Sequence, residues 1–399
     1  MIGACSWRRS SRFGGPRSPE KRCPGCATKG RRAMRTSQHL VSLRTFGLAF
    51  AVVLSPAVMQ SGGSCTPASG DTEATGGDGG SAGTGGMGGD GGIGGSIGDV
   101  FPCTEQGVRD AIAQGGGPHY FACDGSMTAV MGNWGIHIGR DVILDGEGKL
   151  TIESVPSNCS NCYLSIGRGV TAELRRLTVR GHIENLGALT LTNSTVSGGD
   201  YTAIYSLDAL TLHNSTVSST SFFPALITAG QSQLAAVNST ISTEAECALY
   251  VGCWCLFSCN ICEECEYDYG TATATLSSST IVGGICIASC GEATIARTLV
   301  EGQCNGVTSL GYNITSPGDT CSFDPDGTDQ VNVSADDLKL GELADNGGPT
   351  MTHALEAGSV AIDHIPAVDC GVTTDQRGEP RPVGDGCDVG SFERQPEDP

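Results

Sequence analysis

The sequence predicts an all-β solenoid, and three observations support this fold class. One short string occurs in three near-copies, with an Asn at the same place in each. The copies recur about every two dozen residues, a period typical of solenoids, because a unit this short cannot bury a core alone. Within each copy Leu or Ile alternates with Thr, Ser or Ala, as in a short strand with one buried face. The copies are Leu189–Val196, Leu210–Val217 and Leu234–Ile241.

Fainter copies extend the array in both directions, so we expect further coils. No helix-length amphipathic stretch separates the copies, and Gly, Ser and Asn bends join them. This pattern predicts a right-handed parallel β-helix, in which each strand pairs with its equivalent in the next coil. The fainter copies are Leu174–Val179, Leu276–Ile281 and Ile295–Val300, which place Arg176, Ser278 and Arg297 at the Asn position.

The repeated Asn has two interpretations. Asn193, Asn214 and Asn238 each begin an Asn-Ser-Thr triplet, which is also an acceptor sequence for N-glycosylation. Asn also tolerates unusual backbone angles, and its amide can bond to its own backbone or to a stacked neighbour. Because the triplet recurs at the repeat period, we favour a structural bend.

Both ends of the array resemble bacterial β-helix surface proteins. Cys103–Gly115, followed by Phe121–Gly125 and Val142–Gly148, looks like their short N-terminal capping helix and first coils. At the other end, four segments resemble the C-terminal "choice-of-anchor Q" segment of these proteins, which predicts an irregular C-terminal cap. The resemblance implies a secreted or surface-displayed pectate-lyase-like β-helix, in a family whose members mostly have no known activity. The four segments are Leu343–Leu355, Gly358–Asp363, Thr374–Gly378 and Cys387–Glu393.

The N-terminal region predicts export. The apolar run Phe46–Met59 follows Arg35 and Arg44 and is too short to span a bilayer, which is typical of a signal peptide that starts at Met34. Cys65 lies where a lipoprotein cysteine would sit, although ordinary cleavage after Ala57 is the alternative. We therefore expect a protein that is exported to the outer membrane or cell surface, or secreted.

Composition divides the chain into seven parts. Residues 76–98 contain 14 Gly in 23 residues, which predicts a flexible linker. The expected parts are an upstream leader of misassigned translation (1–33), a signal peptide (34–64), the linker (65–99), an N-terminal cap (100–124), the β-helix (125–340), a C-terminal cap (341–393) and a tail (394–399).

Cysteine usage agrees with export. Of 20 Cys, 16 follow the anchor position, an even number that suits a fully oxidised protein. Proximity in sequence suggests four local disulfides: Cys103 with Cys123, Cys159 with Cys162, Cys304 with Cys321 and Cys370 with Cys387. The pairing of the remaining eight, between 247 and 290, stays open.

Charge limits the partners. Residues 65–399 carry 12 Lys or Arg and 42 Asp or Glu, a net charge of −30, which argues against nucleic acid. The same charge repels polyanions unless a cation bridges them. Polysaccharide or other cell-surface components are the partners we expect, with a membrane contacted only through the signal or a lipid anchor. Nothing in the sequence defines the oligomeric state.

The most individual element is an insertion at 244–269, which lengthens one repeat. A loop that leaves a solenoid often carries recognition, and its aromatic residues offer stacking surfaces for sugars. The alternative is a disulfide-bonded knob that uses these aromatics as its own core. The candidate recognition residues are Tyr250, Trp254, Phe257, Tyr267 and Tyr269.

A polysaccharide lyase or hydrolase is the alternative function. A hydrolase needs two carboxylates, which Asp141, Asp145 and Glu153 offer. A lyase needs a basic group beside calcium ligands, and we place three arginines on one strand, with Lys149 nearby and a Gly-His pair at His182. These arginines are Arg175, Arg176 and Arg180.

No catalytic site emerges from these residues. Calcium is the only cofactor we consider, because Asp324, Asp326 and Asp329 surround a Gly turn. The loop lacks EF-hand spacing, so a solvated turn is the simpler interpretation. We therefore expect a tethered β-helix with a structural, adhesion or binding role.

Overall fold

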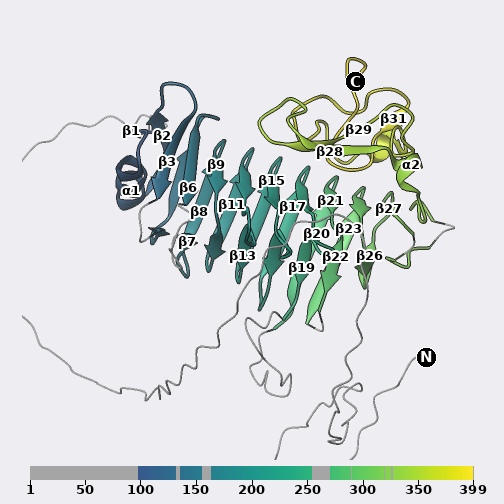
Figure 1. The fold of residues 1–399 in the computed structure, drawn as a ribbon, viewed down its shortest axis with the longest axis horizontal. Helices are drawn as coiled ribbons and strands as arrows, with labels where there is room; N and C mark the ends of the chain where they lie inside the picture. The colour runs from purple at the N-terminus through teal and green to yellow at the C-terminus, as the bar shows by residue number, and fades with distance from the viewer. Residues whose placement is uncertain are drawn as a thin grey trace, which may run out of the picture. The chain divides into compact units, whose positions relative to one another are not determined.

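The computed structural model shows a right-handed parallel β-helix with a short N-terminal helix, which confirms the predicted fold class (Figure 1). It describes residues 98–131, 135–154, 163–253, 270–288, 290–318, 320–324 and 327–398. All of them belong to one compact unit, Asp90–Pro399. Among these residues no helix is long and apolar enough to cross a membrane.

Each regular coil contributes one strand to each of three parallel sheets. Sheet A contains β1 (Val100–Pro102), β2 (Gly116–Ala122), β5 (Val142–Asp145), β8 (Thr171–Arg175), β11 (Ala188–Thr192), β14 (Ala209–His213), β17 (Gln233–Val237), β20 (Ala272–Ser277), β23 (Gly291–Ala296) and β26 (Val307–Ser309). Sheet B contains β3 (Met127–Met131), β6 (Leu150–Ser154), β9 (Thr178–Arg180), β12 (Thr195–Ser197), β15 (Thr216–Ser219), β18 (Thr240–Thr243), β21 (Thr280–Val282), β24 (Leu299–Glu301) and β27 (Ile314–Ser316). Sheet C contains β4 (Ile136–Ile138), β7 (Leu164–Ile166), β10 (Ile183–Asn185), β13 (Ile204–Ser206), β16 (Leu226–Thr228), β19 (Leu249–Val251), β22 (Ile285–Ile287) and β25 (Cys304–Asn305).

The core is the stack of inward side chains at equivalent positions. In sheet A, Leu191 pairs with Leu212, and both are fully buried. In sheet B, Val196 pairs with Val217, which is again fully buried. Because the copies align without a shift of register, each alternating string places its apolar face on the same continuous core.

The repeated Asn forms the bend between sheets A and B. Asn193, Asn214 and Asn238 have φ of 50°, 49° and 48°. This left-handed conformation is costly for most side chains and is one that Asn tolerates. The fainter copies share it, which confirms their alignment: φ is 48° at Arg176, 49° at Ser278 and 52° at Arg297.

Serine, rather than asparagine, forms the hydrogen-bonded ladder at this corner. Ser194, Ser215, Ser239 and Ser279 directly follow the bend and are buried. The Ser215 hydroxyl accepts from the Ser194 backbone N–H at 3.2 Å and donates to the His213 carbonyl at 2.8 Å. Ser239 repeats the arrangement one coil further, because its hydroxyl accepts from the Ser215 backbone N–H at 3.3 Å. The ladder therefore pairs backbone groups that the bend removes from the sheets.

The N-terminal end of the core is closed by α1 (Glu105–Gln114). Thr104 caps this helix, because its hydroxyl accepts from the Gly107 N–H at 3.1 Å. Val108 and Ala111 are fully buried and join the core. The Cys103–Cys123 disulfide ties the start of the helix to the end of β2.

The C-terminal segment folds back over the outer face of sheet B (Figure 1). Its elements are α2 (Ala335–Leu338), the antiparallel pair β28 (Leu340–Ala344) and β29 (Thr352–Leu355), β30 (Ile365–Pro366), the 3-10 helix η1 (Ala367–Asp369) and β31 (Gly386–Cys387). A second apolar cluster joins this segment to Leu299 and Ile314. The segment thus covers a side of the solenoid, while Cys321 and Phe323 contribute to the core beyond the last coils.

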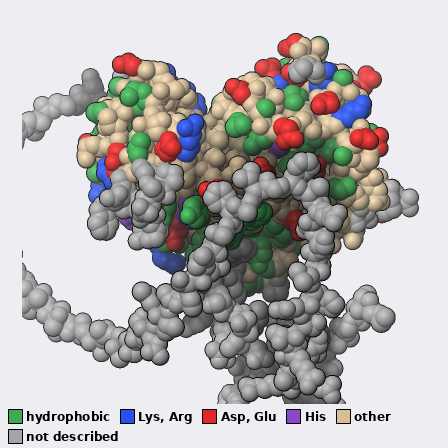
Figure 2. Space-filling view, in the orientation of Figure 1, with side chains coloured by type: hydrophobic (Ala, Val, Ile, Leu, Met, Phe, Trp, Pro, Cys, Tyr) green, Lys and Arg blue, Asp and Glu red, His purple; other side chains and the backbone are tan. Residues whose placement is uncertain are grey.

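Polar residues of the segments Thr374–Gly378 and Cys387–Glu393 make the contact between the C-terminal segment and sheet B. Gln376 donates to the Thr216 hydroxyl at 2.8 Å and accepts from Thr240 at 2.7 Å. Ser391 donates from its backbone N–H to Thr280 at 2.9 Å. These threonines are buried, whereas the equivalent Thr195 is only partly buried. Figure 2 shows a hollow between the segment and the N-terminal coils, where this cover ends.

Candidate binding face on sheet C

The outer face of sheet C carries a row of side chains in register. Glu184 pairs with Tyr205, Tyr205 with Ile227, and Ile227 with Tyr250. Neighbouring strands in a sheet lie about 4.8 Å apart, so Tyr205 and Tyr250 are about 10 Å apart along the axis. Ile227, between them, is only 3% exposed although its side chain points away from the core. The row therefore carries two tyrosines on alternate coils, with a buried isoleucine between them.

Three exposed aromatic residues lie where the chain enters sheet C. Tyr201 is 66% exposed, Phe222 100% and Phe223 52%. Tyr201 lies in the β12–β13 loop and Phe222 and Phe223 in the equivalent β15–β16 loop of the next coil, as the hydrogen bond from Ala203 N–H to the Ala225 carbonyl shows. Exposed apolar groups that gather in one place mark interaction sites.

A serine network fixes these loops. Ser219 donates to the Tyr201 carbonyl at 3.0 Å and accepts from the Ser221 backbone N–H at 3.1 Å. Ser221 in turn accepts from the Phe223 N–H at 3.1 Å. The aromatic side chains therefore project from a loop whose backbone is held in place, which reduces the entropy lost on binding.

The row continues towards the N-terminal coils through Ser165 and His137. Tyr163 and His182 lie just before β7 and β10, and their rings lie edge to face at 6.0 Å. The negative charge of Glu184 is the main cause that raises the pKa of the Tyr163 hydroxyl. Burial lowers the pKa of His182, and its Nδ1 donates to the Thr202 carbonyl at 2.7 Å. His182, noted for its Gly-His context, thus acts as a structural hydrogen-bond donor.

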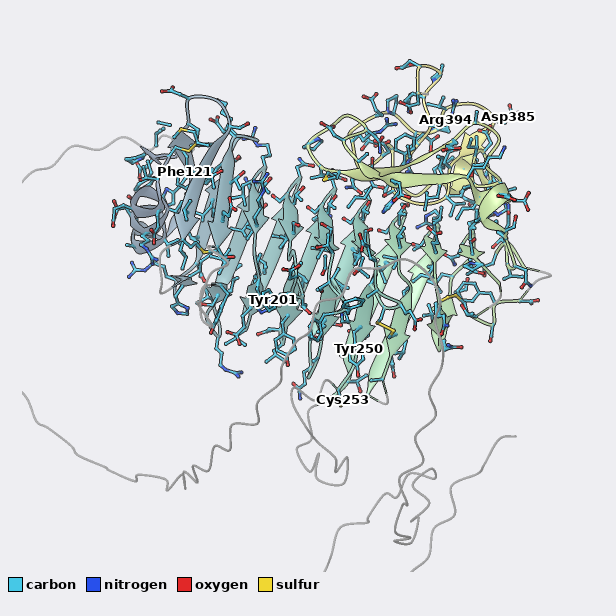
Figure 3. The ribbon with its side chains drawn as sticks, viewed as in Figure 1. Phe121, Tyr201, Tyr250, Cys253, Asp385 and Arg394 are labelled. Atoms are coloured by element: carbon cyan, nitrogen blue, oxygen red, sulfur yellow. A yellow bond between two sulfur atoms is a disulfide. The ribbon has the colours of Figure 1, made fainter. Side chains whose placement is uncertain are left out.

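We name the set Tyr201, Tyr205, Phe222, Phe223 and Tyr250 the aromatic face. In Figure 3 the two labelled members, Tyr201 and Tyr250, lie on the side of the solenoid away from the C-terminal segment, and Cys253 follows close to Tyr250. The face therefore lies free of the segment that covers sheet B.

Basic residues are missing from this part of the chain. Residues 181–296 contain no Lys or Arg but ten Asp or Glu. Asp200, Glu244 and Glu246 are exposed on the loops that lead into sheet C. The aromatic face thus lies in an acidic environment with no cation from this stretch.

The predicted recognition loop is only partly described. Tyr250 lies on strand β19 and not in a loop, because residues 244–253 form the bend after β18 and strand β19 of a regular coil. The Tyr250 hydroxyl donates to the Cys253 carbonyl at 2.8 Å. Trp254, Phe257, Tyr267 and Tyr269 lie outside the described residues.

The arginines considered for a lyase do not share one strand. Arg175 ends β8 in sheet A, Arg176 occupies the left-handed bend and Arg180 ends β9 in sheet B. The bend separates them, a feature that alternation alone did not reveal. Each is paired with a carboxylate: Arg175 with Glu173 at 2.6 Å, Arg176 with Asp145 at 2.6 Å and Arg180 with Glu153 at 3.9 Å.

The acids considered for a hydrolase are similarly engaged. Asp145 is buried, accepts from the Glu147 N–H at 3.0 Å and holds Arg176. Asp141 accepts from the Thr171 N–H at 2.7 Å. Lys149 lies 3.9 Å from Glu147. The contacts of Asp141 and Asp145 join adjacent coils, whereas the Lys149–Glu147 pair lies within one turn.

The described part of the chain holds no cluster of three or more His, Cys, Asp or Glu side chains that would suit a metal ion. In the loop considered for calcium, Asp329 accepts from the Asn313 N–H at 2.7 Å and from its side-chain amide at 3.0 Å. Asp326 lies outside the described residues. Asp329 thus links this loop to the last coils.

Five disulfides are present among the described residues. Three of them join pairs that are close in sequence, and two join positions 247–290 that the sequence left open. Cys159 and Cys162 lie outside the described residues, as does Cys65. The bonds are Cys103–Cys123, Cys304–Cys321, Cys370–Cys387, Cys247–Cys286 and Cys253–Cys290. They indicate an oxidising, extracytoplasmic environment.

The C-terminal motif residues form a buried ionic network. Arg377 contacts Asp375 at 2.9 Å and lies 3.8 Å above the Phe392 ring. Arg381 and Glu393 are fully buried and lie 3.5 Å apart. Burial raises the pKa of Glu393 to about 7, despite Arg381. The network organises the segment internally.

Comparison of the chain with models of known families, with curated proteins and with solved structures gave no match. The class of the protein is therefore defined by its own structure, as a disulfide-bonded parallel β-solenoid.

Proposed function

We propose that this chain is an exported, cell-surface-tethered β-helix protein with an adhesion or binding role. The observation that supports it is the aromatic face on a disulfide-bonded solenoid, whose members Tyr201, Phe222 and Phe223 are exposed and lie on loops with a hydrogen-bonded backbone. The resemblance of both ends to bacterial β-helix surface proteins, carried by their sequence motifs, agrees with this proposal. The Gly-rich stretch 65–99 would supply the tether and Cys65 the lipid attachment.

Antibody labelling of intact cells tests the display. The full chain, with its own leader, is produced in an exporting bacterial host that forms disulfides. We expect labelling of intact cells and recovery in the membrane fraction, and release of Cys65→Ser into the soluble fraction. Ser69→Ala is the control, because it changes a nearby linker residue and leaves every cysteine in place. Labelling only after lysis, or no effect of Cys65→Ser, would contradict the tethered protein.

Attachment of the producing cells to immobilised cell-envelope material tests the binding role. We expect the triple variant Tyr201→Ser, Phe222→Ser, Phe223→Ser to lose attachment while antibody labelling stays unchanged, because these side chains are exposed and do not support the core. Attachment equal to that of the wild type would show that the aromatic face is not the binding surface.

A further inference from the structure

We infer that the aromatic face binds an uncharged polysaccharide chain that lies along the solenoid axis. This inference rests on the proposed function and names its ligand class. It depends on three properties of the described residues: the axial order of the aromatic side chains, the charge around them and the acceptors beside them.

The order of the aromatic residues suits an extended polymer. Tyr201 and Tyr205 belong to one coil, Phe222 and Phe223 to the next, and Tyr250 to the coil after that. Successive coils lie about 4.8 Å apart, comparable with the length of one pyranose unit in an extended chain. The equivalent loops of two consecutive coils therefore offer aromatic rings to successive apolar sugar faces at Tyr201 and at Phe222 and Phe223, and Tyr205 and Tyr250 lie in the adjoining row on sheet C.

The charge around the face selects against anionic polymers. The described residues of the stretch 181–296 carry six carboxylates and no Lys or Arg. Asp200, Glu244 and Glu246 are exposed on the same set of loops. Arg180, which pairs with Ser197 one coil before the Tyr201 loop, lies 3.9 Å from Glu153. A carboxylated or sulfated chain on this face would therefore meet an excess of negative charge, whereas an uncharged chain would not be repelled.

The same side chains offer hydrogen-bond acceptors for sugar hydroxyls. An ionised carboxylate such as Asp200 only accepts, and each sugar hydroxyl donates one hydrogen. Asp200 immediately precedes Tyr201, and the exposed Thr220 precedes the Ser221-Phe222-Phe223 loop. Polar groups therefore flank the stacking surface, an arrangement that gives orientation to an otherwise apolar contact.

Affinity gel electrophoresis of the full chain against a matched polymer series tests the ligand class. The series is an uncharged β-glucan, the same glucan carboxymethylated, and chitosan, each at low and high salt. We expect retention by the uncharged glucan that persists at high salt, and retention by the carboxymethylated form that is weaker by about tenfold.

Two variants locate the contact. The triple variant Tyr201→Ser, Phe222→Ser, Phe223→Ser should weaken retention by about tenfold or more, because aromatic anchors dominate binding energy. The control is Leu310→Ser with Val368→Ser, which removes exposed apolar side chains outside the aromatic face. It should bind as the wild type does, and circular dichroism should show all proteins folded.

Three results would overturn the inference: equal or stronger retention by the carboxymethylated glucan, binding only of chitosan and only at low salt, or wild-type retention by the triple variant. Failure to bind any polymer, with aromatic-dependent attachment of cells intact, would reject the uncharged polysaccharide as ligand and leave the proposed function standing.

Discussion

Single residues at the bend between sheets A and B show how the repeat is encoded. The left-handed position is occupied by Asn in three coils, where the conformation is tolerated locally. Arg176 and Arg297 occupy it in other coils and make compensating contacts. Arg176 holds the buried Asp145, and Arg297 donates to the Ser277 hydroxyl at 3.0 Å. An arginine at this position is destabilised by its left-handed backbone, and its side-chain contacts offset part of that destabilisation.

Substitution of Asn214 isolates the backbone contribution. Asn214→Ala should lower the free energy of unfolding by about 1 kcal/mol, because Ala adopts positive φ poorly. Asn214→Gly should change it by less, since Gly adopts this conformation freely. Chemical denaturation of the two variants measures the difference. Equal stability of the Ala and Gly variants would show that the bend does not depend on the left-handed conformation.

The buried carboxyl group of Glu393 predicts that the stability of the C-terminal segment depends on pH. Its pKa is raised from 4.5 to about 7 by burial, so the folded state binds this proton more tightly than the unfolded state. Stability from this group is therefore present below pH 4.5 and is lost as pH rises from 4.5 to about 7. Hydrogen exchange of residues 375–393 should accelerate across this window.

Glu393→Gln provides the control for that pH dependence, because it keeps the shape of the side chain and removes the titration. Its exchange rates, corrected for the intrinsic effect of pH, should rise less than those of the wild type. The rise that remains belongs to Asp388, because burial raises the pKa of that neighbouring carboxyl to about 6. Slower corrected exchange of the wild type at the upper end of the window would reverse the predicted sign and contradict the raised pKa.

At the scale of elements, sheet B has two kinds of face. Its inner side chains, such as Val217 and Ile241, belong to the core. Its outer threonines Thr216, Thr240 and Thr280 are buried by the C-terminal segment and hydrogen-bond to Gln376 and Ser391. The segment therefore depends on the repeat register, because equivalent threonines must align on successive coils to meet it.

Gln376→Ala should loosen this contact. The change leaves the hydroxyls of Thr216 and Thr350 without their amide donor and Thr240 without one acceptor, which typically costs about 1 to 3 kcal/mol for buried groups. We expect faster proteolysis within 340–398 and an unchanged core. Gln233→Ala, on the exposed face of sheet A, is the control. Unchanged proteolysis would show that apolar packing alone holds the segment.

Much of the arrangement of strands and bends could be predicted from the sequence, and part of it could not. Strong periodicity located the coils, since Leu and Thr alternate with fixed spacing around Asn214. Tyr250 was misplaced because the cysteine-rich composition begins before β19 ends, so composition hid an ordinary strand. The turn at Arg176 likewise separated arginines that are adjacent in sequence, because one left-handed residue redirects the chain.

At the scale of the molecule, the three sheets differ in what lies on their outer faces. Sheet B is covered by the C-terminal segment over several coils, and sheet C presents the aromatic face. Tyr201, Phe222 and Phe223 were missed in the sequence because they lie in irregular loops outside the repeat strings. The signal that would have found them is an adjacent aromatic pair in a Ser-rich loop, at the same place in the coil as Tyr201.

The most direct test is a hydrogen-exchange footprint of the full chain with and without an uncharged glucan oligosaccharide. We predict slower exchange in the loops 198–203 and 220–225 and in strands β13, β16 and β19, with sheet A and the C-terminal segment unchanged. Protection centred on sheet A, or in the hollow beside the C-terminal segment, would contradict the aromatic face as the binding surface.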